Sequence, residues 1–387
     1  MKQIPSRIPS LDGLRAISIS LVVVGHWAEL RYHSDVAGAF ANLGVRIFFI
    51  ISGYLITTLL LKEHRKTSTI RLGEFYVRRA YRILPAAMAF MLPAFVIFWH
   101  ELRWYHMAAA ALYLANFDYA HPWFLGHLWS LSVEEQFYFL WPGVLKRWWR
   151  HRVAILAGVV AFAPVYRVAC HLLGLHGQAD ETFPAVADVL AIGCLLAVMD
   201  GNIRSSHPST SSGQAFSQSR RDPSTSLRAG VGHPNPNPTS RKSGEKWGIP
   251  FFSASRISAL WAAAMLVPVI FVPVYVGRHN FHITALLLFV LWPAMHLSIA
   301  GLLKHVVERP YGFLNARPIV WLGQISYSLY LWQQVFIFGE HAQPWHSVFF
   351  ALGMASASFY LVERPMLRLR ERRVERRKLR SEAAVAA

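Results

Sequence analysis

Long apolar runs, separated by short polar segments, recur from one end of the chain to the other. Each run is about 20 residues long, which is the length of helix that crosses a hydrocarbon core of about 30 Å. The runs are continuous rather than alternating, and this favours helices over the strands of a membrane barrel. We therefore predict an all-α integral membrane protein with about ten transmembrane helices in one bundle. The predicted spans are residues 14–33, 44–62, 84–100, 128–145, 153–173, 183–200, 256–276, 281–303, 318–338 and 346–364.

Composition supports this class of protein. Apolar residues make up 54% of the chain and charged residues only 16%, whereas a soluble domain carries about a quarter charged residues. The two cysteines, Cys170 and Cys194, are too few for a disulfide framework or a zinc site. We interpret them as small packing residues, and we expect no bound metal.

The positive charge is distributed unevenly. Most of the 39 Lys and Arg residues fall in alternate loops, on the side that also holds both ends of the chain. The positive-inside rule then predicts cytoplasmic termini and a multi-pass protein of the inner (cytoplasmic) membrane. The same asymmetry explains the net charge of +18 without nucleic acid. The basic tail, residues 367–387, is interpreted as a solvated helix at the anionic inner leaflet.

Two segments interrupt the apolar pattern. Residues 201–250 are rich in Ser, Pro, Gly and Asn, which predicts a disordered cytoplasmic linker. This linker divides the membrane core into residues 1–200 and 251–366. Residues 101–127 hold a short apolar run and many aromatic side chains. An interfacial or re-entrant outer segment fits them, either as a lid or sugar-contact surface or as a plain aromatic belt.

The first predicted span carries two ionisable residues, Arg15 and His26, eleven positions apart. Eleven helical steps return to within roughly 20° of the same face, about 16 Å further along the axis. Ionisable groups inside a bilayer are costly and mark candidate functional sites. His26 is therefore a candidate general base, because neutral imidazole can take a proton from a hydroxyl group. The alternative is a histidine that only packs between helices.

Two further clusters bear on this site. Arg79 and Arg82 lie three apart, and a guanidinium pair suits phosphate recognition. Ordinary positive-inside charge is the alternative. Pro85 is expected to open the next span, at a position where a helix tolerates proline. Glu134 and Glu135 lie about a third of the way into another span. We expect one of them to face the interior and orient His26, the role of the carboxylate in a catalytic triad. A structural role beside a buried cation such as Arg167 is the alternative.

One weaker pair and one packing motif complete the set. Asp188 could pair with Arg167, and we interpret this pair as structural. The small residues Ser52 and Gly53 permit two helices to approach closely.

Taken in order, these segments resemble the acyltransferase-3 family of multispanning membrane O-acyltransferases. The resemblance covers residues 8–200 and 256–366. It is carried by SLDGLRAISISLVVVGHW, FFIISGYLIT, RRAYRILPA, HLWSLSVEEQFYFLWP, the span from Asp188 to Gly193, ISYSLYLW and VERP. The linker is longer than the resemblance predicts. No soluble esterase-like domain follows the last span, which disfavours a peptidoglycan acceptor.

The resemblance implies transfer of an acyl group, usually acetyl, from cytoplasmic acyl-CoA to a hydroxyl of a carbohydrate. It implies that Arg15, His26, Arg79 and Arg82 are essential and that Glu134 is the motif glutamate. In this hypothesis the arginines hold the CoA phosphates and His26 meets the thioester. His26 then either deprotonates the acceptor or carries the acyl group itself.

Two other classes stay open. One is a transporter or flippase of a lipid-linked sugar, and the other is a haem- or quinone-binding protein with His296 as a modest partner for His26. The acceptor, the acyl-chain length and the oligomeric state cannot be read from the sequence.

Overall fold

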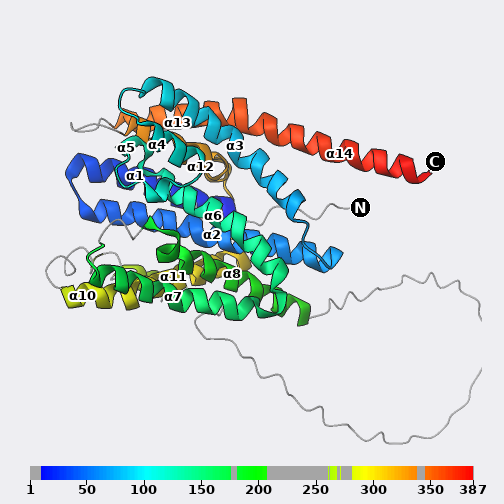
Figure 1. The fold of residues 1–387 in the computed structure, drawn as a ribbon, viewed down its shortest axis with the longest axis horizontal. Coiled ribbons are helices and arrows are strands. Elements are labelled where there is room, and N and C mark those ends of the chain that lie inside the picture. The colour runs from blue at the N-terminus through cyan, green and yellow to red at the C-terminus, as the bar shows by residue number, and fades with distance from the viewer. Residues whose placement is uncertain are drawn as a thin grey trace, which may run out of the picture.

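The computed structural model describes residues 10–175, 181–206, 260, 262–267, 271, 281–337 and 345–386. Within these residues every regular element is a helix. Figure 1 shows the long helices lying side by side in one bundle. The elements are α1 (Leu11–Tyr32), α2 (Asp35–Thr67), α3 (Leu72–Ile97), α4 (Trp104–Ala111), η1 (Ala115–Phe117), α5 (Trp123–Gly126), α6 (Leu128–Arg147), η2 (Trp149–His151), α7 (Arg152–Leu172), α8 (Phe183–Ser206), α10 (Phe281–Leu286), η5 (Leu287–Leu291), α11 (Trp292–Glu308), η6 (Phe313–Asn315), α12 (Arg317–Phe336), α13 (His346–Ser358), η7 (Phe359–Glu363) and α14 (Arg364–Ala386).

The order of the helices across the bundle is set by their contacts. Helix α1 packs between α2 and α12, α2 continues the row to α8 and α7, and α12 continues it to α13. Figure 1 shows the same order, from α13 at one edge to α7 at the other. The first helix, which carries Arg15 and His26, therefore lies in the interior of the row.

Six helices among the described residues are long and apolar enough to cross a membrane. They are Leu11–Tyr32, Asp35–Thr67, Leu72–Ile97, Trp149–Leu172, Phe183–Asp200 and Thr284–Glu308. Helices α6, α12 and α13–η7 match three more of the predicted spans. The predicted span 256–276 lies mostly outside the described residues, and the predicted linker 201–250 lies outside them from residue 207 onward. The count of ten and the orientation of the termini stay predictions.

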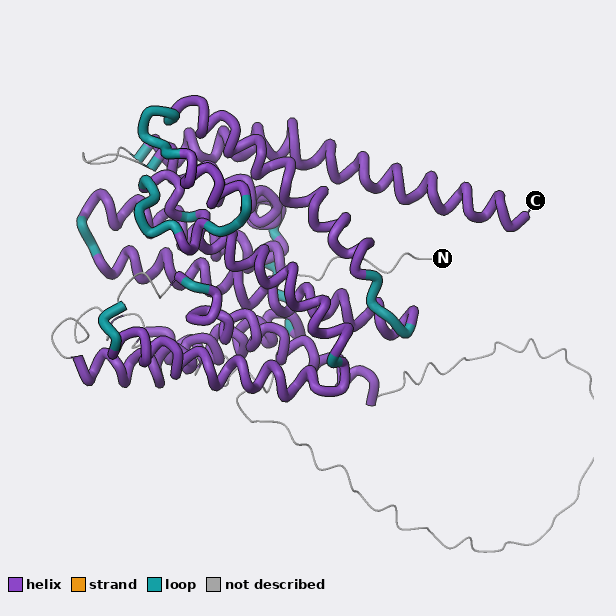
Figure 2. The backbone as a smooth tube through the Cα atoms, in the orientation of Figure 1, coloured by secondary structure: helices purple, strands orange, loops and turns teal. Residues whose placement is uncertain are grey.

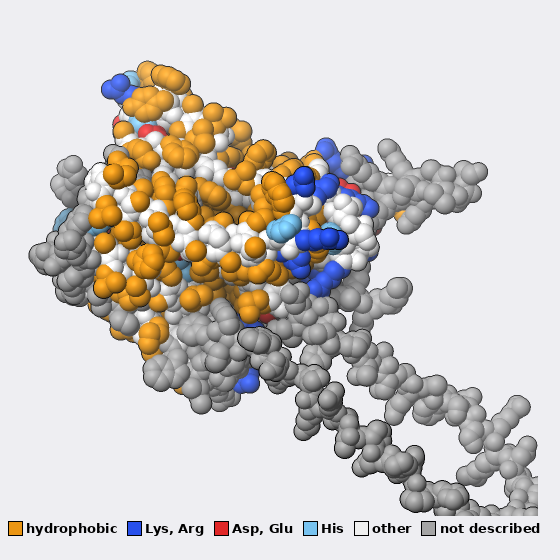
Figure 3. Space-filling model, turned by 60° about the horizontal axis from the view of Figure 1, so that its bottom comes forward, with side chains coloured by type: hydrophobic (Ala, Val, Ile, Leu, Met, Phe, Trp, Pro, Cys, Tyr) orange, Lys and Arg blue, Asp and Glu red, His pale blue; other side chains and the backbone are white. Residues whose placement is uncertain are grey.

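The outer surface has the polarity that a bilayer requires. Large apolar side chains such as Val96, Leu172 and Leu361 are more than half exposed. Figure 3 shows hydrophobic side chains covering much of one face, with Lys and Arg gathered at one end. The α2–α3 and α6–α7 connections carry exposed basic residues, among them Lys66, Arg71 and Arg147. An apolar band with a basic end is the pattern of a multi-pass helical protein.

One predicted helix boundary is wrong. The sequence places Arg79 and Arg82 in a polar run before a span that Pro85 opens, but α3 begins at Leu72 and contains Pro85. Proline is tolerated inside membrane helices because neighbouring groups can compensate for the lost hydrogen bond. The arginines consequently belong to the membrane helix itself, and α3 carries them into the bundle.

The predicted close approach at Gly53 is confirmed. A Cβ atom at Gly53 would collide with the backbone carbonyl of Leu190, and one at Gly193 would collide with that of Ile50. Gly53 belongs to α2 and Gly193 belongs to α8. Each glycine therefore lets the backbone of the other helix come into contact with its own. Small residues of this kind are the usual means of tight helix packing in membranes.

Residues 101–127 are a chain of short helices and turns rather than a span, as Figure 2 shows. Part of this segment is buried against α6. The Ala115 N–H donates to Ser132 Oγ (3.1 Å), and Gln136 Nε2 donates to the Tyr113 carbonyl (3.0 Å) and to Asn116 Oδ1 (2.8 Å). Non-helical backbone inside a membrane protein needs such partners. The contacts favour the re-entrant alternative and explain two polar residues of α6.

Candidate active site

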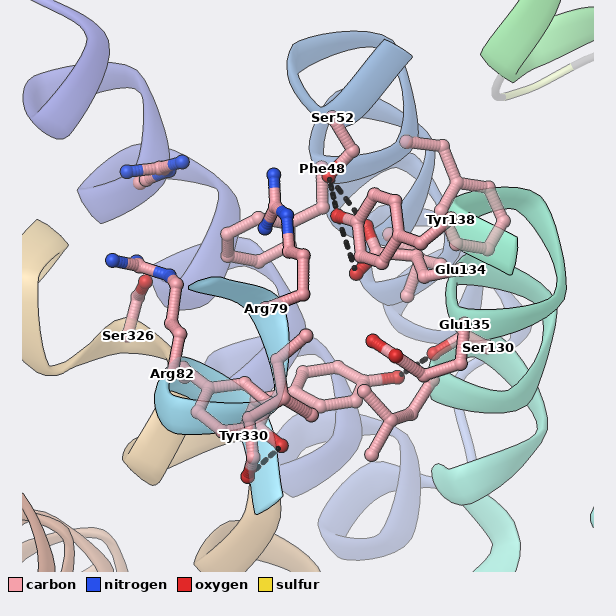
Figure 4. A pocket seen from close by; sticks show the side chains of 16 residues that line it. Phe48, Ser52, Arg79, Arg82, Ser130, Glu134, Glu135, Tyr138, Ser326 and Tyr330 are labelled. Atoms are coloured by element: carbon pink, nitrogen blue, oxygen red, sulfur yellow. Dashed lines mark hydrogen bonds between the residues drawn. The ribbon is translucent and has the colours of Figure 1, made fainter. Parts of the chain in front are cut away.

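Three helices bring the predicted arginines and glutamates to one cavity. Arg15 comes from α1, Arg79 and Arg82 come from α3, and Glu134 and Glu135 come from α6. Figure 4 shows Arg79, Arg82, Glu134 and Glu135 around the cavity. The remaining lining side chains are Val45, Phe48, Phe49, Ser52, Ile83, Ser130, Leu131, Tyr138, Ser326, Tyr327 and Tyr330.

The arginines keep most of their hydrogen-bonding capacity for the cavity. The Arg79 guanidinium lies over the Tyr138 ring, 4.3 Å from its centroid. Arg15 Nη1 lies 3.6 Å from Asp12 Oδ1. Because a guanidinium has five N–H donors in a fixed fork, these contacts leave donors available to a bound anion. Arg79 and Arg82 follow the predicted spacing of three residues and share one face of α3.

Glu134 is held by α2 rather than by His26. Ser52 Oγ donates to Glu134 Oε1 (2.7 Å), and Tyr138 donates to Ser52 Oγ (3.0 Å). The prediction that Glu134 orients His26 is therefore not supported by the contacts of either side chain. The sequence indicates the depth of each group along its helix but not which neighbour its helix faces. Glu134 points toward α2, while His26 points toward α12.

Both adjacent glutamates line the cavity, whereas we expected only one to face the interior. Glu135 Oε1 is buried and has no hydrogen-bond partner. Glu135 also borders a second, mostly apolar cleft between α3 and α6. Neighbouring residues on a helix point in directions roughly 100° apart. The cavity therefore covers a wide enough part of the α6 surface to include both side chains.

His26 lies beyond the cavity lining, and its polar partner is Gln333 of α12. The His26 Nδ1 and Gln333 Oε1 atoms are 3.2 Å apart. The Trp123 ring meets the imidazole edge-on, with centroids 6.0 Å apart. Trp123 belongs to the 101–127 segment, so this segment does contact the predicted catalytic residue.

A layer of hydrogen-bonded side chains leads from the cavity lining to His127. Ser130 and Tyr330, both cavity-lining, are hydrogen-bonded to each other and also to the His127 carbonyl. Gln334 Oε1 accepts hydrogen bonds from the His127 backbone N–H and from Nδ1, both at 2.8 Å. Residues 326, 330 and 333 of α12 thus lead from the arginines to the imidazole in successive turns.

A second polar cluster lies elsewhere in the bundle. The predicted Asp188–Arg167 pair is present, with Arg167 Nη1 and Nη2 at 3.0 and 2.9 Å from the two carboxylate oxygens. His296 Nδ1 donates to Asp188 Oδ2 (3.1 Å), and Arg46 Nη1 donates to His296 Nε2 (2.9 Å). All four side chains are at most 3% exposed. His296 therefore belongs to this network, which makes it a poor candidate for pairing with His26 around a haem.

Sequence reasoning missed several residues of the site. Ser52 was interpreted only as a packing residue, and neither Tyr330, which lines the cavity, nor Glu363, which lies near Arg82, was among the predicted site residues. Glu363 is in fact 1% exposed, accepts a hydrogen bond from Ser328 and lies within charge range of Arg82. Gln333 was not noticed at all. Its signal was available, because a glutamine pair inside an apolar run needs internal partners in a membrane.

The charges that line the cavity bear on whether acyl-CoA could bind there. Three arginines against two cavity-lining glutamates leave a cationic surplus, which suits the phosphates of CoA. The glutamates lie on α6, across the cavity from α3. The phosphates would therefore lie against Arg15, Arg79 and Arg82, and the chemistry of the lining fits the group at that side.

Comparison with known proteins agrees with this architecture. The family model described as "Acyltransferase domain" matches residues 8–362, so the chain belongs to this acyltransferase family. A peptidoglycan O-acetyltransferase of Listeria monocytogenes is 31% identical over 220 residues, which are 49% of this chain and 33% of that protein. An O-acetyltransferase of Staphylococcus aureus is 39% identical over 160 residues, which are 36% of this chain and 25% of that protein. The chain thus spans at most a third of the length of these relatives, and no solved structure matches it.

Proposed function

We propose that the protein transfers an acyl group, acetyl in the first instance, from cytoplasmic acyl-CoA to a hydroxyl of a cell-surface or secreted carbohydrate. One observation carries the proposal. Arg15, Arg79 and Arg82 line one cavity, and His26 lies on the same helix as Arg15, about three turns further along α1. Two relatives named O-acetyltransferases support the reaction class. The name of one supports a glycan acceptor, although both are much longer proteins.

The proposed donor enters from the basic end. Arg15, Arg79 and Arg82 bind its phosphates through charge-assisted hydrogen bonds. The pantetheine arm then runs along α1 and α12 toward His26, about 16 Å beyond Arg15 along the helix axis. The layer of Ser130 and Tyr330 has to open for the thioester to pass. Such side-chain movements are fast compared with a typical turnover.

The chemistry at His26 follows from a neutral imidazole. In direct transfer, the Nε2 lone pair takes the proton of the acceptor hydroxyl, and the hydroxyl oxygen bonds to the thioester carbon. The C–S bond then breaks, and the thiolate takes the proton back from the imidazolium. In the relay route, Nε2 attacks the thioester carbon, the C–S bond breaks and CoA leaves as the thiolate. The acceptor oxygen then bonds to the acyl carbon, the bond from Nε2 to that carbon breaks, and the thiolate takes the hydroxyl proton. Both routes need an unprotonated Nε2.

Thiol release tests the proposal. Purified protein in detergent is incubated with acetyl-CoA, a glycan acceptor and a thiol reagent, and an acceptor-dependent release of CoA thiol is expected. The control is His26→Gln, which keeps a polar side chain beside Gln333. A wild-type protein that binds a lipid-linked sugar but releases no thiol with any glycan tested would instead indicate a flippase.

A second measurement separates the two routes. Wild-type protein is incubated with acetyl-CoA alone, quenched and digested, and the peptides are weighed by mass spectrometry. An acetyl group on the His26 peptide supports the relay. An unmodified peptide from a protein that is active with acceptor supports direct transfer.

A further inference from the structure

Two adjacent glutamines of α12, Gln333 and Gln334, each accept a hydrogen bond from a histidine ring, but their remaining contacts differ. Gln334 Oε1 accepts two hydrogen bonds from His127, which ties α12 to the start of α6. Gln333 Oε1 accepts one from His26 Nδ1. The Gln333 side chain is fully buried, and its Nε2 has no hydrogen-bond partner. Burying an unsatisfied amide N–H is unfavourable, so this donor calls for an explanation.

The Gln333 contact settles which ring nitrogen of His26 is free. A carboxamide oxygen can only accept a hydrogen bond, so His26 Nδ1 carries the hydrogen. The lone pair then resides on Nε2. In the expected triad a carboxylate would do the same, but Glu134 is bound to Ser52. The neutral amide therefore replaces the carboxylate as the group that orients the base.

The free Gln333 N–H lies beside that base. It belongs to the same amide whose oxygen contacts Nδ1 of the imidazole, so this donor lies on the Nδ1 side of the ring, and the carbonyl oxygen of a thioester at Nε2 has to extend along the ring to reach it. His127 Nε2 is a second buried atom without a partner, but because His127 Nδ1 donates to Gln334 Oε1, Nε2 has a lone pair and no hydrogen to donate. The Gln333 N–H is thus the unused donor of this contact, and a buried donor that the protein itself does not use is what a site for a developing negative charge requires.

We propose that Gln333 is a catalytic residue of the acyl transfer, which orients His26 through Oε1 and donates from Nε2 to the acyl carbonyl oxygen. The inference rests on the proposed function. As the acceptor oxygen (or Nε2 in the relay route) bonds to the carbonyl carbon, the C=O electron pair moves onto the carbonyl oxygen. The Gln333 N–H stabilises that oxyanion until the pair returns and the C–S bond breaks. In direct transfer the proton from the hydroxyl resides on His26 Nε2 in the meantime and leaves with the thiol. In the relay route CoA leaves as the thiolate, and this thiolate takes the hydroxyl proton when the acceptor attacks the acyl-imidazole.

Two substitutions separate the two roles. Gln333→Leu removes both the acceptor and the donor, and kcat is expected to fall by about 10³-fold with an unchanged KM for acetyl-CoA. Gln333→Glu keeps an acceptor for His26 Nδ1 but has no N–H, and kcat is expected to fall by about 10²-fold. A carboxylate also stabilises the imidazolium, so the pH at which the Gln333→Glu enzyme becomes active should move upward.

Gln324→Ala is the matched control, because it changes a glutamine of the same helix outside this contact. It is expected to keep wild-type kcat. Wild-type kcat in Gln333→Glu would overturn the donor role, and an unchanged kcat and pH profile in Gln333→Leu would overturn the whole inference. If the wild-type protein itself releases no thiol, it is the proposed function that fails. Thermal unfolding in detergent checks that each variant is folded.

Discussion

The bundle holds two groups of buried ionisable side chains that are built in opposite ways. In the network of Arg46, Arg167, Asp188 and His296, the two carboxylate oxygens and both imidazole nitrogens are engaged by other members. Among these side chains only Arg167 Nε is left without a partner. In the cavity, by contrast, Glu135 and the guanidinium groups face open space. The comparison indicates that the first group ties helices together, while the second keeps polar groups available in a cavity, as the proposed function requires.

The two histidines show the same difference. His296 donates through one nitrogen and accepts through the other, so it has no lone pair available for chemistry. His26 donates through Nδ1 only, and its Nε2 has no partner among the described residues. A histidine whose hydrogen bonds are complete is structural, while one with a free nitrogen beside unused donors is a candidate catalyst.

The largest expected effect is on His26. His26→Gln should lower acceptor-dependent thiol release by at least about 10³-fold, because no other group at that position can take the proton. The unfolding temperature should stay near that of the wild type. The same substitution at His296 should do the reverse, with a lower unfolding temperature and retained activity per folded molecule. Equal losses of activity in both variants would erase the distinction between the two groups.

The next effect concerns Asp188. Asp188→Ala leaves Arg167 without its carboxylate and His296 Nδ1 without its acceptor, and we expect a loss of about 3–5 kcal/mol in the free energy of unfolding. Unfolding in mixed detergent micelles measures it. In the double variant with Arg167→Met the loss should be smaller than in Asp188→Ala alone, because one of the buried charges has also gone. A double variant that is less stable than the single one would contradict the electrostatic explanation.

The cavity arginines should change binding rather than folding. Arg79→Ala and Arg82→Ala are each expected to raise the KM for acetyl-CoA by about 10-fold, since a hydrogen bond to a charged group contributes about 1.5–3 kcal/mol. Arg78→Ala is the control, because Arg78 pairs with Glu63 instead of lining the cavity. Steady-state titration with acetyl-CoA separates KM from kcat. An equal rise for Arg78→Ala would point to general surface charge.

The smallest effect is expected at Glu135. Its Oε1 has no partner, so Glu135→Gln should leave the free energy of unfolding unchanged or raise it by up to about 1 kcal/mol. Glu134→Gln should lower stability, because it weakens the contact with Ser52. Chemical unfolding of both variants provides the comparison, and a larger loss for Glu135→Gln would contradict the assigned contacts.

The sequence predicts correctly those features that depend on a single helix, namely where the helix lies and which residues share one of its faces. The apolar periods placed the main helices, and the spacings of Arg15 and His26 and of Arg79 and Arg82 placed each pair on one face. The Asp188–Arg167 pair was also foreseen, because opposite charges in neighbouring spans have few other solutions in a bilayer. Pro85 misled the boundary of α3, since a membrane helix tolerates proline that a soluble helix would not.

What could not be predicted depends on how helices are rotated toward one another. The depth of Glu134 and of His26 can be counted along each helix, but the choice between Ser52, His26 and Gln333 as partners needs the packing of α1, α2, α6 and α12. For the same reason Gln333 and Glu363 looked unremarkable in the sequence. Polar residues inside apolar runs deserve the same scrutiny as charged ones, because each must find a partner within the bundle.

The central claim is that a donor held by the arginines on one side delivers its acyl group through His26 to an acceptor on the other side. Vesicles containing protein of measured orientation test it, with radiolabelled acetyl-CoA only on the side of the Arg-rich end and glycan acceptor only on the opposite side. The account predicts label on the acceptor with wild-type protein and none with His26→Gln. Label that appears only when donor and acceptor share one side, or that appears equally with His26→Gln, would contradict it.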